Sequence, residues 1–222
     1  MRLYNNVLML IFVALFLIVA SIVVISEDKS NKISGNIVNT HVEVLPVSSK
    51  NCSFHLNPGW NMVSFYCLGL FSDRSVVLGS IDGYYGSIFE YNSNDATDPW
   101  KSYNPELPSW TVQQLTHMDR ISGYWIYMHT DADFNYPGIY SDSVIYLYNG
   151  WNFVGYPNTN RTNINVSLNG IPFTVVKYYN TTSNTWQVYV NGSPSNTLNY
   201  FETYKGYWIN VNGNPQWIIT RG

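Results

Sequence analysis

The sequence predicts an all-β fold, mainly antiparallel, built as two tandem copies of a small β domain with one short helix each, behind an N-terminal transmembrane helix. Three observations predict it: an apolar run at residues 7–25, short β-branched and aromatic runs separated by Asn-Gly, Asp-Gly and Asn-Pro-Gly turns, and a residue pattern that occurs twice. Aromatic residues make up 17% of the chain and charged residues only 11%. A composition so rich in aromatics argues against a disordered chain. The net charge of −3, without a basic run, predicts no nucleic-acid partner.

The first 26 residues predict a signal anchor. As a helix, the run at 7–25 would be about 28 Å long, which is close to the ~30 Å core of a bilayer. Arg2 precedes the run, whereas the charges that follow it nearly cancel. The positive-inside rule then predicts a single-pass protein with a cytoplasmic N-terminus and residues 27–222 outside the membrane. The alternative is a signal peptide cleaved near Ser26, which would release a secreted protein.

The segment after the run predicts a polar stalk at 27–50, because it is rich in Ser, Asn and Lys. Within it, residues 41–47 alternate like a strand and end at Pro46. The folded part therefore begins near residue 41 or 51.

The rest of the chain contains one pattern twice, which predicts copy one at residues 51–140 and copy two at 141–222. The matching segments are Gly-Trp-Asn at 59–61 and 150–152, Tyr-Asn at 91–92 and 179–180, and Gly-Tyr-Trp-Ile at 123–126 and 206–209. They occur in the same order, and their offsets drift only by loop-sized steps. The period is too long for a solenoid unit of about 20–50 residues, so we expect two small domains.

The sequence of each copy predicts short strands, a hairpin and a helix. The predicted strands are 62–66, 87–91, 124–128, 143–147, 153–156, 174–179, 186–190, 207–211 and 217–220. The Asn-Pro-Gly at 57–59 and the Asn-Gly at 149–150 predict a hairpin at the start of each copy. The three-residue spacing of Val112, Leu115 and Met118, and of Leu198 and Phe201, predicts the helix of each copy.

The Gly-Trp-Asn turn, the Tyr-Asn hairpin leading to Trp and the Gly-Tyr-Trp-Ile strand together resemble a repeat of archaeal and bacterial cell-surface proteins. In both copies these segments are present, and together they cover most of residues 51–222. The resemblance implies an exported, often membrane-anchored protein. It carries no catalytic residue that could be transferred to this chain.

The tryptophans divide into repeated and unrepeated sets. The repeated ones predict the core of each copy, since a small domain needs the large area that each aromatic buries; they are Trp60, Trp100, Trp125, Trp151, Trp186 and Trp208. Unrepeated or loop aromatics are the candidates for stacking on sugar rings, namely Tyr84, Tyr85, Trp110, Tyr136, Tyr140 and Trp217.

Cys52 and Cys67 flank the first predicted hairpin, so they would lie roughly opposite one another. Outside the cell, two such cysteines favour a disulfide. The alternative is two buried free thiols.

Catalytic and metal-binding patterns are weak. The acids near Asp95 lack the Gly and closing Glu of a Ca²⁺ loop, and the four His match no nucleophile motif. We therefore expect no metal, no cofactor and no catalytic residue.

The favoured function is a membrane-anchored cell-surface protein with an adhesive, envelope-structural or binding role, whose partner is an envelope glycan or a surface protein. A carbohydrate-binding module is the first alternative, and an extracytoplasmic hydrolase is the second.

Overall fold

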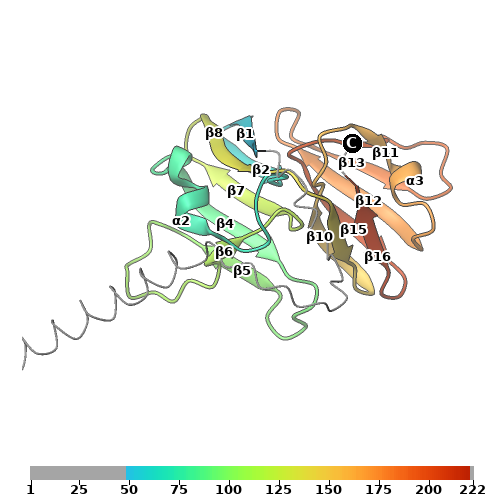
Figure 1. Cartoon of the computed structure of the whole chain (residues 1–222), viewed down its shortest axis with the longest axis horizontal. Coiled ribbons are helices and arrows are strands. Elements are labelled where there is room, and N and C mark those ends of the chain that lie inside the picture. Colours follow the sequence, from blue (N-terminus) through green and yellow to red (C-terminus); the bar gives the residue numbers. More distant parts are fainter. Residues whose placement is uncertain (1–48, 221–222) are drawn as a thin grey trace, which may run out of the picture. The chain divides into compact units, whose positions relative to one another are not determined.

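The computed structural model describes residues 49–220, in which strands dominate (Figure 1). The strand pairs in this range are all antiparallel, which confirms the predicted all-β class. The predicted anchor at 1–26 and the strand-like stretch at 41–47 lie outside the described residues, as does nearly all of the stalk. Within the described range, no helix has the length and apolarity needed to cross a membrane.

Copy one has eight strands and two short helical turns. The strands are β1 (Ser49–Leu56), β2 (Gly59–Val63), β3 (Ser72–Asp73), β4 (Tyr85–Tyr91), β5 (Trp100–Tyr103), β6 (His117–Met118), β7 (Tyr124–Met128) and β8 (Ala132–Ile139). The helical turns are α2 (Arg74–Val77) and the 3-10 turn η1 (Gly79–Ile81).

Copy two repeats this order of elements. Its strands are β9 (Ser143–Tyr146), β10 (Gly150–Gly155), β11 (Thr162–Asn163), β12 (Phe173–Asn180), β13 (Thr185–Val190), β14 (Tyr200–Phe201), β15 (Gly206–Val211) and β16 (Gln216–Ile219). Its single helix is α3 (Ile164–Ser167).

The two copies have the same sheet topology (Figure 1). Copy one forms a four-stranded sheet in the order β2-β7-β4-β5, and copy two forms its equivalent in the order β10-β15-β12-β13. The paired strands β1-β8 and β3-β6 correspond likewise to β9-β16 and β11-β14. The described residues nevertheless belong to one compact unit, so a domain boundary at residue 140 stays a prediction.

The predicted entry hairpins are wrong, although the turns themselves exist. The Asn61 amide accepts a hydrogen bond from Asn57 N and donates to Asn57 O, and Asn152 does the same with Tyr148. The glycine that follows each turn, Gly59 or its equivalent, has a positive φ, which fits glycine. The turn redirects the chain instead of folding it back: β1 pairs with β8, whereas β2 pairs with β7.

The predicted helix positions are also wrong. Leu115 is buried in an extended segment whose backbone N–H donates to Ser102 O, and Met118 lies in strand β6. One α-helical turn per copy does occur, but it follows β3 or β11. Asp73 and Asn163 start these turns by accepting backbone N–H bonds, as side chains with an oxygen acceptor do at an N-cap.

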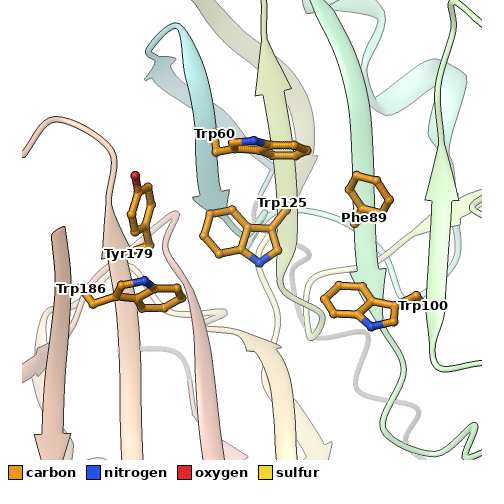
Figure 2. A pocket seen from close by; sticks show the side chains of 6 residues that line it. All are labelled: Trp60, Phe89, Trp100, Trp125, Tyr179 and Trp186. Carbon is orange, nitrogen blue, oxygen red and sulfur yellow. The ribbon is translucent and has the colours of Figure 1, made fainter. Parts of the chain in front are cut away.

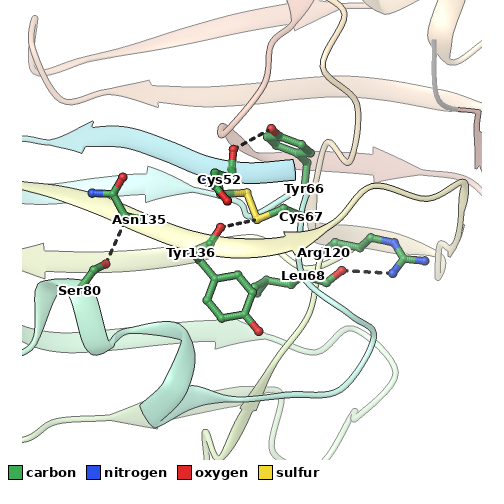
Figure 3. Close-up of a disulfide and its surroundings, with 9 residues drawn as sticks. Cys52, Tyr66, Cys67, Leu68, Ser80, Arg120, Asn135 and Tyr136 are labelled. Carbon is green, nitrogen blue, oxygen red and sulfur yellow. Dashed lines mark hydrogen bonds between the residues drawn. A yellow bond between two sulfur atoms is a disulfide. The ribbon is translucent and has the colours of Figure 1, made fainter. Parts of the chain in front are cut away.

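The predicted disulfide is present: Cys52 is bonded to Cys67, with 5.9 Å between their Cα atoms (Figure 3). Both residues are fully buried. Cys67 O also accepts a 2.9 Å hydrogen bond from Ile139 N, so residue 67 lies beside β8. The bond therefore ties β1 to the segment after β2 and not across a hairpin.

Peptide mapping of the unreduced protein is expected to recover two peptides joined through Cys52 and Cys67. Since the two sulfur atoms are bonded to each other, iodoacetamide added after denaturation without reductant should label neither residue. Reduction before alkylation is the control and should label both. Labelling of both thiols in the unreduced, denatured sample would contradict the assignment.

Candidate functional site

The repeated tryptophans are not the core, and this part of the sequence prediction is wrong. Four of them are 39–48% exposed, namely Trp60, Trp100, Trp151 and Trp186. Trp125 and Trp208 are only partly buried. The cause is strand alternation, which sends successive side chains to opposite faces. In β7, the neighbours Tyr124 and Ile126 point into the core of copy one, so Trp125 points to the other face.

The predicted stacking residues are also partly misassigned. Tyr85, Tyr140 and Trp217 are buried, so they cannot form an exposed platform. Tyr84 and Trp110 are exposed, but neither lines the aromatic cavities described below. Tyr136 is half-buried in β8.

The aromatic faces of the two four-stranded sheets meet through reciprocal ring contacts. Trp125 of copy one lies with its ring centroid 5.5 Å from that of Tyr179 and 6.0 Å from that of Trp186. Its equivalent in copy two, Trp208, lies 5.1 Å from Tyr91 and 5.9 Å from Trp100. Each tryptophan of the Gly-Tyr-Trp-Ile motif therefore packs against the Tyr and Trp that form the hairpin of the other copy.

Backbone contacts between the copies are reciprocal as well. Ser64 N donates to Tyr204 O and Gly155 N donates to Ile121 O, both at 2.8 Å. These pairs occupy equivalent positions in the two copies, which implies an approximate two-fold relation between them.

The glycine of each Gly-Tyr-Trp-Ile motif lies where the two copies meet. A Cβ added at Gly123 would lie 2.6 Å from the Phe153 ring, and one at Gly206 would lie 2.7 Å from Val63 O. The glycine of the motif is therefore explained by the close approach of the copies.

Six aromatic side chains surround an open cavity of about 470 Å³, here called the first cavity (Figure 2). Its lining consists of Trp60, Phe89, Trp100, Trp125, Tyr179 and Trp186. The rings come from strands of both copies, and Figure 2 shows them around one space. Polar groups lie beside it: the Tyr179 hydroxyl donates to Asn184 Oδ1, and the Thr181 hydroxyl donates to Trp60 O.

A second cavity, of about 500 Å³, lies on the equivalent face of copy two. Its lining consists of Trp151, Lys177, Trp186, Val188 and Trp208. Because Trp186 lines both cavities, the two share one wall. The volumes fall within the ~300–1,000 Å³ range of small-molecule sites.

Glu90 is a half-buried acid at the edge of the same interface. Burial, reinforced by the negative charge of Asp119, raises the pKa of Glu90 to about 7. Its Oε1 accepts a 3.0 Å bond from the hydroxyl of Ser122, the residue that bridges to Val154 of copy two. The Asp119 carboxylate is occupied by the backbone N–H groups of Ile121 and Ser122. These bonds give both acids a structural role at the junction.

Comparison with known proteins finds no matching family model, no matching curated protein and no matching solved structure. The fold and the site define an antiparallel β protein with two similar four-stranded sheets and an aromatic cavity where they meet. The resemblance to cell-surface repeats stays a prediction.

Proposed function

We propose that this chain is an exported, membrane-anchored cell-surface protein whose aromatic cavities bind the sugar residues of a glycan. The observation that carries the proposal is the convergence of six aromatic side chains, four of them Trp, on one open cavity. The anchor at residues 7–25 and the extracytoplasmic placement of residues 27–222 belong to the same proposal, and they rest on the sequence pattern.

The ring chemistry favours sugars over an aliphatic peptide. One face of a pyranose carries C–H groups with slight positive charge, and the face of an indole is electron-rich. When a pyranose stacks on an indole, its slightly positive C–H groups therefore contact the electron-rich ring face. Trp60, Trp100 and Trp186 are each 40–48% exposed, although large apolar side chains are normally buried. They also sit on strands, which hold the rings in place before a ligand arrives.

The open wall of the cavity favours a chain-like ligand. Trp186 separates the first cavity from the second, so adjacent sugars of one oligosaccharide can occupy the two. Hydroxyl and amide groups near the rings, such as Tyr179 and Asn184, can hydrogen-bond the sugar hydroxyls.

Replacing Trp186 with alanine is expected to weaken oligosaccharide binding at least tenfold, because the change removes a ring that lines both cavities. A tenfold loss corresponds to about 1.4 kcal/mol of binding free energy. A glycan array identifies the best-bound oligosaccharide for the full chain in detergent. Isothermal titration calorimetry then compares the wild type with Trp186→Ala.

Trp110→Ala is the matched control, because Trp110 is 82% exposed and lies outside both cavities. It should bind the oligosaccharide like the wild type. A wild-type chain that binds no glycan would contradict the proposal. If the chain instead dimerises in a way that Trp186→Ala abolishes, the aromatic face is a protein interface.

A further inference from the structure

The two cavities occupy equivalent faces but differ at one position. Phe89 lies opposite Trp125 in the register of β4 and β7, and Lys177 lies opposite Trp208 in the register of β12 and β15. Each precedes by two residues the Tyr-Asn of its hairpin. Phe89 and Lys177 are therefore structural counterparts, one in the wall of each cavity.

Each of the two side chains lies beside the tryptophan of the Gly-Trp-Asn turn in its own copy. The Phe89 ring centroid lies 5.8 Å from that of Trp60, and Lys177 Nζ lies 5.0 Å from the ring centroid of Trp151. An ammonium at this distance is attracted by the indole face. Copy two thus places a positive charge where copy one places a phenyl ring.

Lys177 has no carboxylate partner among the residues that the structure describes. Lys101 lies 2.8 Å from Asp95, and Lys205 lies 2.6 Å from Glu202. In the described range, the charge-dependent contact of Lys177 is the Trp151 ring. A lysine ammonium has three N–H donors, which a ring face alone does not satisfy.

We propose that the second cavity selects an acidic sugar, with its carboxylate bound to Lys177 and its ring stacked on the neighbouring tryptophans, while the first cavity takes a neutral ring. This inference rests on the proposed glycan-binding function. The occupant follows from charge complementarity, since one ammonium in an otherwise apolar wall of three Trp and one Val matches a ligand with one negative charge and a flat C–H face. Ion pairing in an aromatic-walled site is also screened less than pairing at an open surface.

The probe is an oligomer of galacturonic acid, compared with the same oligomer after its carboxyl groups are reduced to alcohols. The two ligands share ring geometry and differ in charge. With the full chain in detergent, calorimetry should show at least tenfold tighter binding of the acidic oligomer at low salt. Lys177→Met keeps most of the aliphatic stem and removes the charge, so it should abolish this preference.

Two further variants sharpen the test. Arg161→Met removes a positive charge elsewhere in copy two, outside both cavities, and should leave the acid preference intact. Phe89→Lys places a second ammonium in the first cavity and should increase the preference. The inference is overturned if the wild type binds both oligomers equally, or if Lys177→Met keeps the preference. If neither oligomer binds and no other glycan does, the proposed function itself fails.

Discussion

Replacing Trp217 with alanine is expected to destabilise the fold by about 3–5 kcal/mol, as is typical when a buried tryptophan is truncated. Trp217 is 1% exposed and packs against Tyr156 and Phe201 in the core of copy two. Its indole N–H donates a 2.9 Å bond to Ser167 O, which would lose its partner. Single domains have a total stability of about 5–15 kcal/mol. Urea denaturation followed by circular dichroism should therefore show a much lower midpoint.

Trp110→Ala removes the same side chain from an exposed position and serves as the control. Surface changes usually stay within about 0.5 kcal/mol, so its midpoint should match the wild type. Equal midpoints for the wild type and Trp217→Ala would show that the core of copy two is packed differently.

Lowering the pH from 8 to 5 is expected to stabilise the fold through Glu90. The pKa of Glu90 in the folded chain is about 7, above the reference value of 4.5. Its contribution to stability is therefore fully present below pH 4.5 and is lost as the pH rises through 7. The difference in pKa corresponds to roughly 3 kcal/mol. The pKa values of Asp73 and Asp95 are lowered by hydrogen bonds, so these groups titrate below this pH window.

Thermal melts of the full chain at pH 5 and pH 8 measure this effect. Glu90→Gln keeps a side-chain oxygen that can accept the Ser122 bond, but it cannot ionise. This variant should be more stable than the wild type at pH 8 and should lose the part of the pH dependence that comes from Glu90. Asp119, whose pKa is also raised by burial, keeps its own part. Asp82→Asn, an exposed position, is the control and should retain it. A Glu90→Gln protein with the wild-type pH profile would contradict the assignment.

Local patterns were sufficient to predict most of the strands. The run of large side chains at 124–128 predicts β7, and the run at 207–211 predicts nearly all of β15. Strand β8 was missed because Pro137 and Gly138 interrupt its apolar pattern, although both are accommodated in its pairing with β1. The prediction of the entry hairpins is wrong for a different reason. A turn sequence indicates only that the chain changes direction, whereas the strand that pairs with the next strand depends on the rest of the fold.

The candidate site could not be predicted because alternation does not say which face of a strand is inward. In β7 both faces are apolar, with Tyr124 and Ile126 on one and Trp125 and Tyr127 on the other. Repetition was interpreted as a sign of core packing, whereas it reflects an interface that both copies share. The available signal was the glycine before each Tyr-Trp pair, which indicates a close approach on that side.

The reciprocal contacts between the copies have a consequence for how well their interface must be packed. If the copies were two separate molecules, their association would cost translational and rotational entropy. Burying as much of the aromatic ring surface as possible would then be needed to offset that cost. Here the copies are consecutive in one polypeptide, so the effective concentration of one copy around the other is in the millimolar range or above. The backbone bonds and ring contacts already described are then enough to keep the sheets together. The remaining aromatic surface can stay uncovered, and the covalent connection is thus what allows the cavities to remain open.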